Sequence, residues 1–360
     1  MATKLLRFAM IGFGGRGQYH AKNLEQVEGI PAQCVAVADP RTPTAEEKAR
    51  FGPAFYQDYR ELLAHEKDLD CVIIASPDAE HVEHALATLA HGLPVFLEKA
   101  VATHWDDAVR LYRTVVKNHY PLFVGYNLRR FPASLAMKRI LDEGQLGRVQ
   151  SVLGHVNTGN RWSKSVYDHY TMPPFLGLII GKLTHDTDTV QHCLGAEAAT
   201  CSAVITRNIW PEKPDGVFNQ CDACCLTGLL TNGILYTFHL TTSGPDYERR
   251  YTVNGTKGQM DVIMHTNRPG APTASVTLWL DGQEPHMVDL PIARGGHGGA
   301  DIQIHRDFFA WLQTRPTEPY EPRSILSGMV IPIAALESAR TNTLINCQAL
   351  MQQATAGLEL

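Results

Sequence analysis

The first 125 residues alternate short apolar runs with stretches of helical spacing, and this rhythm restricts the possible folds more than any other feature. Strands are expected at residues 5–11, 34–38, 69–75, 93–97 and 122–125, with helices at residues 19–27, from after residue 77 to about 90, and 105–117. Near-continuous apolar strands that alternate with helices are typical of a parallel sheet covered on both faces. We therefore predict a doubly wound α/β domain over residues 1–125.

After Gly125 the pattern changes, and a second domain is expected over residues 126–360. Helices are expected near residues 132–143, 175–194, 305–313 and 325–360, a half-buried strand at 149–157, and several β-rich segments over about 200–290. Asn232-Gly233 between two apolar runs, residues 221–230 and 234–240, predicts a hairpin. This describes an α+β domain with a large, mainly antiparallel, open-faced sheet. The C-terminal helix could pack back on the first domain.

The composition excludes several classes of protein. A chain of 360 residues with 44% hydrophobic and 19% charged residues fits two globular domains. It contains no run of 18 apolar residues and no signal-peptide pattern at its start, so we expect no membrane span. The formal net charge of −5, without a dense Lys/Arg cluster, argues against nucleic acid. Eight scattered cysteines indicate reduced thiols in a cytoplasmic protein.

Residues 12–17, Gly-Phe-Gly-Gly-Arg-Gly, match the pattern G-x-G-x-x-G between an expected strand and an expected helix. Gly12 permits the tight turn, Gly14 lets the backbone approach a pyrophosphate, and Gly17 allows close packing of the helix. The phosphates would then lie at the positive end of that helix. This context predicts a dinucleotide site.

Asp39 lies 22 residues after Gly17, at the end of the next strand. Its carboxylate would accept hydrogen bonds from both ribose hydroxyls of the adenosine and would repel a 2′-phosphate. Arg41 complicates this prediction, because an arginine near that position can pair with a 2′-phosphate. The sequence therefore favours NAD as cofactor and leaves NADP open.

Two segments carry candidate catalytic residues. Glu98-Lys99 follows a strand, and ligands of doubly wound sheets bind beyond the carboxyl ends of the strands. A lysine partly desolvated beside a positively charged nicotinamide should have a lowered pKa, which suits a base or proton relay. On the expected helix 175–194, Lys182 and His185 are neighbours at i,i+3, as are His185 and Asp188. Each segment alone also has a structural interpretation. Glu98-Lys99 could be a solvated ion pair, and His185 is one of 16 histidines, any one of which could be structural.

The loop over residues 158–174 is polar and rich in aromatic residues, which suits a polyhydroxylated substrate whose C–H faces stack on rings. The expected substrate-binding residues are Asn157, Arg161, Trp162, Lys182 and His185. An oligomer contact is an equal alternative for any one loop residue. Cys221 and Cys224 form C-x-x-C, but on a strand they point to opposite faces and no second ligand pair follows, so we expect no metal site.

In combination, these segments resemble the Gfo/Idh/MocA oxidoreductases, the relatives of glucose–fructose oxidoreductase and inositol dehydrogenase. The resemblance covers nearly the whole chain. The segments that carry it are the glycine motif at 12–17, Asp39, Ser-Pro-Asp-Ala-Glu-His at 76–81, Glu98-Lys99, Lys-x-x-His-Asp at 182–186, and glycine-rich motifs at 254–258 and 297–301. The resemblance implies a Rossmann domain and hydride transfer between NAD(P) and a secondary alcohol of a sugar, sugar acid or cyclitol.

The resemblance also implies functional residues. The expected cofactor-binding residues are Gly12, Phe13, Gly14, Gly15, Arg16, Gly17, Asp39, Arg41, Ser76, Pro77, His81, Glu98 and Lys99. The expected catalytic residues are Lys99, His185 and Lys182, with His185 as the base and Lys99 orienting the alcohol; the converse assignment is open. A structural role for His81 is an equal alternative. Ala100 stands where the family usually has proline, and Gly181 where it often has aspartate.

Other classes of function are kept as alternatives. One is an NAD-dependent glycosidase or lyase that holds its cofactor tightly, and another is a non-catalytic nucleotide-binding sensor. An open-faced sheet in the second domain would need a partner, so we expect a homodimer or homotetramer that forms through this sheet. The expected ligand besides the cofactor is a small carbohydrate-like substrate.

Overall fold

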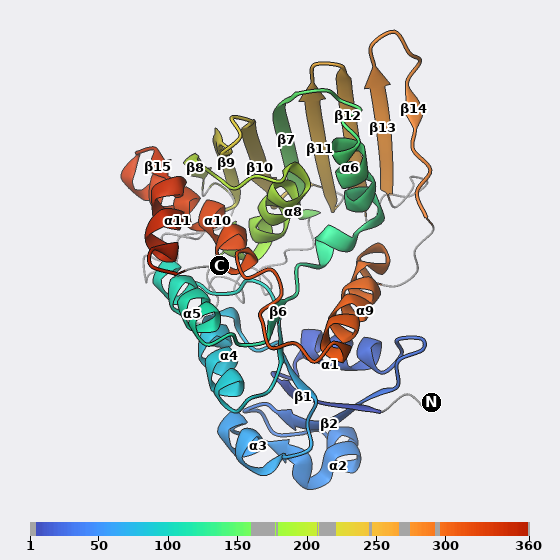
Figure 1. Cartoon of the computed structure of the whole chain (residues 1–360), viewed down its shortest axis with the longest axis vertical. Coiled ribbons are helices and arrows are strands. Elements are labelled where there is room, and N and C mark those ends of the chain that lie inside the picture. The colour runs from blue at the N-terminus through green and yellow to red at the C-terminus, as the bar shows by residue number, and fades with distance from the viewer. Residues whose placement is uncertain are drawn as a thin grey trace. The chain divides into compact units, whose positions relative to one another are not determined.

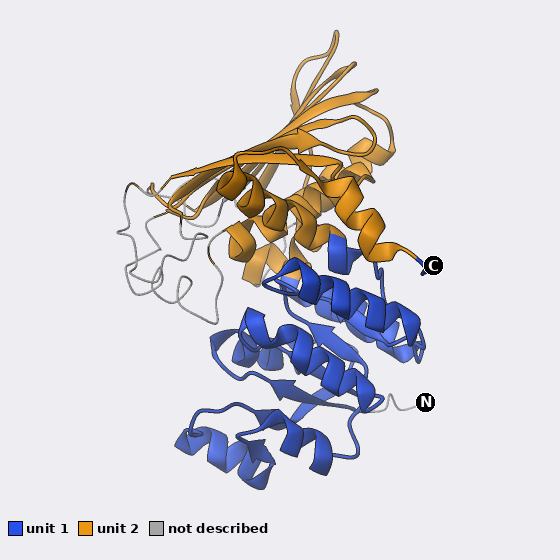
Figure 2. Ribbon diagram, turned by 90° about the vertical axis from the view of Figure 1, so that its left-hand side faces the viewer, with its two compact units in different colours: residues 1–125, 301–326, 357–360 blue, residues 126–300, 327–356 orange. Residues whose placement is uncertain are grey.

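The chain forms two compact units in a computed structural model, which describes residues 5–159, 177, 179–206, 208, 221–244, 247–265, 274–291 and 296–358. Unit 1 comprises Met1–Gly125, Asp301–Leu326 and Gly357–Leu360, and unit 2 comprises Tyr126–Ala300 and Ser327–Ala356 (Figure 2). Both units are therefore discontinuous in sequence. The segment 301–326, which falls within the expected second domain, is grouped with unit 1.

Unit 1 is built on a six-stranded sheet in which every pair of neighbouring strands is parallel. The strands are β1 (Leu6–Ile11), β2 (Ala32–Ala38), β3 (Phe55–Tyr56), β4 (Cys71–Ile74), β5 (Val95–Leu97) and β6 (Leu122–Val124). Their order, β3-β2-β1-β4-β5-β6, is that of a doubly wound nucleotide-binding fold. The predicted α/β class is confirmed.

The helices that connect these strands include two that the periodicity did not reveal. The helices of this part of the chain are α1 (Gly15–Leu24), α2 (Ala45–Phe51), α3 (Tyr59–His65), α4 (His81–Ala90) and α5 (Trp105–Lys117). The two unpredicted helices, α2 and α3, have seven residues each, too few for a clear apolar stripe. Side chains cap them instead: Thr44 and Glu47 form a capping box on α2, and Asp58 caps α3.

Helix α9 (Ala300–Gln313) fills the core of unit 1, although it comes late in the sequence. Phe308 is fully buried, with its ring centroid 5.3 Å from that of Phe96 and 5.5 Å from that of Phe123. Phe96 and Phe123 belong to neighbouring strands, β5 and β6. Burying a phenylalanine stabilises a fold by about 1.5–3 kcal/mol. The Rossmann sheet therefore depends on this distant segment for part of its core.

Unit 2 contains a nine-stranded sheet. Its order is β14-β13-β12-β11-β7-β10-β9-β8-β15. The strands are β7 (Val149–Asn157), β8 (Thr200–Thr206), β9 (Ala223–Leu229), β10 (Leu235–Thr241), β11 (Glu248–Gly255), β12 (Gly258–His265), β13 (Ala274–Leu280), β14 (His286–Met287) and β15 (Ile345–Asn346). All neighbouring pairs are antiparallel except β7 and β10. The predicted mainly antiparallel sheet is confirmed.

Side chains alternate between the two faces of this sheet. Val152 and Val156 of β7 are buried, while Leu153 between them is 49% exposed. Helix α6 (Pro132–Asp142) contacts β12 and β13, and α11 (Cys347–Thr355) contacts β8. The helices of unit 2 lie along one face of the sheet (Figure 1). Leu153 and other residues that alternate with the buried ones lie on the opposite face.

The local expectations in unit 2 have mixed outcomes. The hairpin is confirmed: β9 and β10 pair across a turn in which Gly233 has φ +81°. The helical stretch expected at 325–360 is instead α10 (Ser324–Thr341), then strand β15, then α11. Asn342, with φ +54°, ends the first helix, and the side chain of Asn346 caps the second. Of the helices that the structure describes, none is both long and apolar enough to cross a bilayer.

Candidate active site

The glycine turn between β1 and α1 shows which glycines the protein's own packing requires. Gly12 has φ +86°, and a Cβ there would lie 2.4 Å from the backbone nitrogen of Ser76. A Cβ on Gly17 would lie 2.2 Å from the carbonyl oxygen of Gly12. At Gly14, by contrast, a Cβ would meet no described atom within 4 Å. Packing thus explains Gly12 and Gly17, whereas Gly14 faces open space through which a ligand can approach the backbone.

The N-terminus of α1 fits a phosphate group. Its N-cap is Gly14, and within the described chain no side chain caps it and no acidic residue lies in its first turn. The first N–H groups of a helix have no partner inside the helix, and its N-terminus carries partial positive charge. An anion at this position would satisfy these groups, as anions do at the helix N-termini of known dinucleotide sites.

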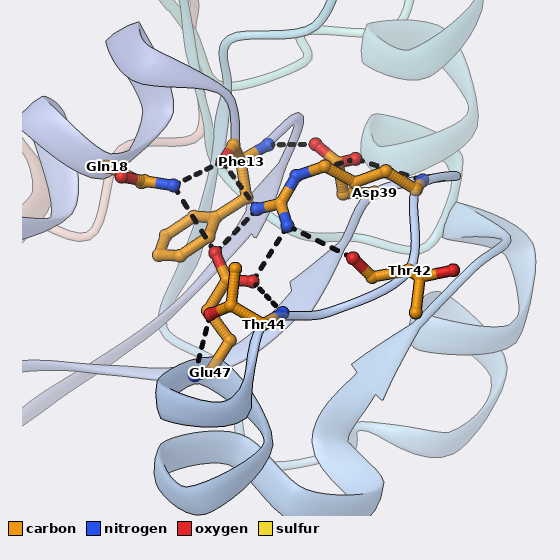
Figure 3. A network of polar contacts seen from close by, with 7 residues as sticks. Phe13, Gln18, Asp39, Thr42, Thr44 and Glu47 are labelled. Atoms are coloured by element: carbon orange, nitrogen blue, oxygen red, sulfur yellow. Dashed lines mark hydrogen bonds and ion pairs between the residues drawn. The ribbon is translucent and has the colours of Figure 1, made fainter.

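Asp39, directly after β2, is tied to the glycine turn. Its Oδ2 accepts a hydrogen bond from the backbone N–H of Phe13 at 2.7 Å, and its Oδ1 accepts one from the N–H of Arg41 at 3.2 Å (Figure 3). Two backbone donors therefore fix the carboxylate at the strand end where the adenosine ribose of a dinucleotide is expected. The side chain of Arg41 forms an ion pair with Glu47, a residue that the sequence did not single out.

Glu98, directly after β5, is a buried carboxylate that fixes the backbone of Lys99. Its Oε2 accepts a hydrogen bond from the N–H of Lys99 at 2.8 Å. Its Oε1 accepts hydrogen bonds from Nε of Arg16 at 2.6 Å and Nε2 of His20 at 2.7 Å. Burial opposes ionisation of Glu98, but Arg16 and His20 together hold its pKa well below the ordinary value. The backbone of Lys99 is thus tied, through Glu98, to Arg16 and His20 of helix α1.

The network around Glu98 continues to α9. Arg16 also donates from Nη2 to Asp301 at 2.9 Å, and His20 Nδ1 lies 2.7 Å from His305 Nε2. Because Glu98 is a carboxylate, His20 must donate from Nε2; its Nδ1 therefore accepts, and His305 donates. Burial lowers the pKa of both histidines, so both rings are neutral. Of these partners, the sequence pointed to Arg16, expected at the cofactor, and to Asp301, the last residue of the motif at 297–301; it pointed to neither His20 nor His305.

His81 supports the segment on the other side of Lys99. It is the first residue of α4, is 1% exposed, and its Nδ1 lies 2.7 Å from the carbonyl oxygen of Ala100. Its Nε2 lies 2.9 Å from the carbonyl oxygen of Ser76. Ser76 in turn places its hydroxyl 2.9 Å from Nδ1 of His84. His81 therefore connects the two strand ends, after β4 and β5, where the expected cofactor residues lie.

In unit 2, the segment with Lys182 and His185 begins with a π-helical turn (Ile179–Leu183) that runs into α8 (Thr184–Leu194). Such turns are rare in proteins and frequent at functional sites. His185 is 9% exposed, and Lys182, within the π turn, is half-buried. Gly195, with φ +60°, ends α8.

Two carboxylates that follow His185 anchor α8 on different elements of unit 2. Asp186 accepts hydrogen bonds from Nε of Arg249 at 2.8 Å and from the hydroxyl of Tyr251 at 2.5 Å, both on β11. Asp188 accepts two hydrogen bonds from Arg129. Burial raises the pKa of Asp186, and Arg249 and Tyr251 oppose that rise. His185 precedes these anchors directly, so its backbone position is determined by both.

The structure describes only one of the three substrate-binding residues that were expected in or next to the loop 158–174. Asn157 ends β7, and its Oδ1 accepts a hydrogen bond from the N–H of Gly159 at 2.8 Å. Arg161 and Trp162 lie outside the described residues. All eight cysteines lie within the described part of the chain and are free thiols.

Comparisons with known proteins agree with this architecture. Residues 6–126 match a family model described as an oxidoreductase family with an NAD-binding Rossmann fold, and residues 134–261 match the GFO/IDH/MocA C-terminal domain. Inositol 2-dehydrogenase 2 of Saccharopolyspora erythraea is 30% identical over 313 residues, which are 85% of this chain and 84% of that relative. The chain belongs to the Gfo/Idh/MocA oxidoreductase family. As a family member, it is an oxidoreductase whose unit 1 is an NAD-binding Rossmann domain.

Solved structures show the same Gfo/Idh/MocA fold. Levoglucosan dehydrogenase, in complex with NADH and levoglucosan, has a TM-score of 0.80 at 21% identity, over 96% of this chain and 100% of that chain. The scyllo-inositol dehydrogenase of Lactobacillus casei, with bound NAD(H) and scyllo-inositol, has a TM-score of 0.77 at 17% identity, over 96% of this chain and 100% of that chain. At these identities the likeness concerns the fold.

The neutral histidine pair gives a prediction about pH. An unfolded histidine takes up a proton near pH 6.5, whereas burial keeps His20 and His305 neutral in the folded chain at that pH. The contribution of these histidines to the free energy of unfolding should therefore be fully present above about pH 6.5. Below that pH, the free energy of unfolding should fall by at most about 1.4 kcal/mol per pH unit for each histidine. Urea unfolding at a series of pH values measures this dependence.

The variant His305→Gln should weaken this pH dependence, because glutamine retains an N–H donor toward His20 and does not titrate. The matched control is His65→Gln, at an exposed histidine of the same unit, which should leave the slope unchanged. Equal slopes for the wild type and His305→Gln would show that the pair does not carry the effect.

Proposed function

We propose that this chain is an NAD-dependent dehydrogenase that oxidises a secondary alcohol of a cyclitol, sugar or sugar acid. The observation that carries the proposal is the backbone of Lys99, held by buried Glu98 at a strand end of an NAD-binding domain. The Lys-x-x-His segment, whose lysine lies in a π-helical turn and whose histidine lies in the helix that follows, falls within the family's second domain and is consistent with it. The names of the relatives, which include inositol dehydrogenases, support cyclitols as the substrate class.

In the proposed reaction, bound NAD supplies the acceptor for the hydride that leaves the carbinol carbon. The chain has to remove the hydroxyl proton and stabilise the developing alkoxide, so that an alcohol becomes a ketone. We assign the proton to the ring of His185, and orientation of the alcohol oxygen to the ammonium group of Lys99. Lys182 would hold a second substrate oxygen. Asn157, Arg161 and Trp162 are the further proposed substrate contacts.

NAD as the cofactor agrees with the geometry of unit 1. Gly14 faces open space, the N-terminus of α1 is free of acidic residues, and Asp39 is fixed at the end of β2. The remaining cofactor contacts that we propose are the turn residues Phe13, Gly15 and Arg16, and the strand-end residues Ser76, Pro77 and His81. Buried Glu98 would act on the cofactor site by positioning Lys99 and Arg16.

We further propose that the chain forms a homodimer or homotetramer through the open face of the unit 2 sheet, and that it works in the reducing cytoplasm. Leu229 and Leu235 pair directly across β9 and β10, and both are more than two-fifths exposed. Leu153 lies on the adjacent strand β7, and Val204 is 70% exposed on β8. Several large apolar side chains exposed on one sheet favour an interface. The free thiols support the compartment.

The experiment that tests the reaction is a spectrophotometric screen for reduced cofactor with cyclitols, sugars and sugar acids, run separately with NAD and NADP. We expect NADH to form with at least one cyclitol or sugar, and NAD to be preferred. Turnover of a substrate with retained cofactor and without net NADH would point instead to the glycosidase or lyase alternative. Binding of NAD without any turnover would point to the sensor.

The roles of the catalytic residues are tested on the substrate found in that screen. Lys99→Ala and His185→Ala should each lower kcat by about 10²–10⁴, because a positioned acid–base group contributes about that factor. The dissociation constant of NAD should stay near the wild-type value. Matched controls are Lys117→Ala at the end of α5 and His192→Ala two turns further along α8, which should retain activity. Full turnover in His185→Ala would show that this histidine is structural.

The oligomer is tested by light scattering at micromolar concentration. We expect a mass of two or four chains for the wild type. Leu235→Glu combined with Leu153→Glu should lower the mass, because charges buried without partners oppose association. Leu344→Glu is the control, since this exposed leucine lies outside the strands of the sheet. A strictly monomeric wild type would refute the interface.

A further inference from the structure

Arg41 is the residue of unit 1 that could pair with the 2′-phosphate of NADP, because it lies two positions after Asp39 at the end of β2. A guanidinium group has five N–H donors in a fixed planar arrangement. Whether Arg41 can bind a phosphate therefore depends on how many of these donors are already engaged. The structure shows a contact for each nitrogen of the side chain.

Every nitrogen of the Arg41 side chain faces oxygen atoms of the protein. Nη2 donates to Oε1 of Glu47 at 2.5 Å and to the carbonyl oxygen of Phe13 at 3.0 Å. Nη1 donates to Oε2 of Glu47 at 2.7 Å and to the carbonyl oxygen of Thr42 at 3.4 Å. Nε lies 3.4 Å from Oδ1 of Asp39. Four of these contacts are hydrogen bonds and the fifth is an ion-pair contact, so most donors of Arg41 are already engaged within the protein.

Glu47 supplies the two short, parallel contacts in this set, and it is itself held firmly. It is the third residue of α2, where its Oε2 accepts a hydrogen bond from the N–H of Thr44 at 2.8 Å (Figure 3). Nε2 of Gln18, on α1, lies 3.3 Å from its Oε1. The residue is only 7% exposed. The carboxylate is therefore a fixed acceptor that belongs to a helix cap, with little freedom to follow Arg41 toward a ligand.

The charge of Glu47 is also permanent under physiological conditions. The hydrogen bonds from Arg41 lower the pKa of Glu47 to about 2. A carboxyl group with a depressed pKa stays ionised above its ordinary pKa and becomes neutral only as the pH falls toward the depressed value. The pairing with Arg41 is therefore in place at any pH at which the enzyme would work.

We propose that Glu47 is a specificity-determining residue for the cofactor: it holds Arg41 away from a 2′-phosphate and so makes the chain select NAD over NADP. Asp39, Arg41 and Glu47 together carry one net negative charge, which repels a phosphate of about −1.5 to −2. Without Glu47, this group would be neutral and Arg41 would have donors to offer. This inference rests on NAD as the cofactor of the proposed function and adds a second determinant to Asp39.

Calorimetric titration of NAD and NADP into the full-length protein tests this without a substrate. Hydrogen bonds to a charged group are worth about ten- to hundredfold in affinity. Glu47→Gln removes the charge and retains an acceptor for the N–H of Thr44, and Glu47→Ala removes both contacts with Arg41. We expect NADP to bind about tenfold more tightly to Glu47→Gln than to the wild type, and more tightly still to Glu47→Ala. The affinity for NAD should change little.

The matched control is Glu46→Gln, which removes the same charge from the preceding, exposed position of α2 and should not change either affinity. Adding Arg41→Ala to Glu47→Gln should abolish the gain for NADP, because the released guanidinium is its source. An unchanged NADP-to-NAD ratio in folded Glu47→Gln and Glu47→Ala would overturn the role of Glu47. Absence of NAD binding in the wild type would instead overturn the proposed cofactor, and the inference with it.

Discussion

The carboxylate of Glu98 is buried in unit 1 between cationic and hydrogen-bonding groups, and much of the nucleotide-binding half depends on how these groups meet. One oxygen accepts from Arg16 and His20 of α1, and the other accepts from the backbone of Lys99. Removing Arg16 or His20 would leave the buried charge of Glu98 with less compensation and should destabilise the fold. Helix α1, proposed to face the phosphates, and the proposed catalytic lysine therefore share one anchor. A displacement of helix α1 should therefore also shift the backbone of Lys99, and the reverse.

Unit 2 uses a related arrangement around α8. Asp186 connects this helix to β11 through Arg249 and Tyr251, and Asp188 connects it to Arg129. A π-helical turn is less regular than an α-helix, and these pairs hold the helix that directly follows it. In both units, buried charges lie next to the proposed reactive side chains in the sequence. The backbones of Lys99 and His185 are therefore positioned by these neighbouring carboxylates.

The sequence predicted those features of the candidate site that follow from local rules. Gly12 and Gly17 were predictable because only glycine fits where they stand, and Asp39 and Lys99 because they follow apolar strands. The partners of Glu98 were not predictable in the same way. His305 lies 285 residues from His20 in the chain, and nothing in the local pattern of either residue indicates the other. Glu47 was missed for a related reason, since seven-residue α2 gives no clear periodic signal.

The discontinuous course of unit 1 has a consequence for synthesis on the ribosome. The chain leaves unit 1 after Gly125 and returns at Asp301, so 175 residues must be translated before α9 can begin to emerge. At about 5–20 residues per second, this interval is about 10–35 s. Throughout it, the aromatic rings of Phe96 and Phe123 lack the cover of Phe308. The strands of the Rossmann sheet are thus synthesised well before the helix that completes their core.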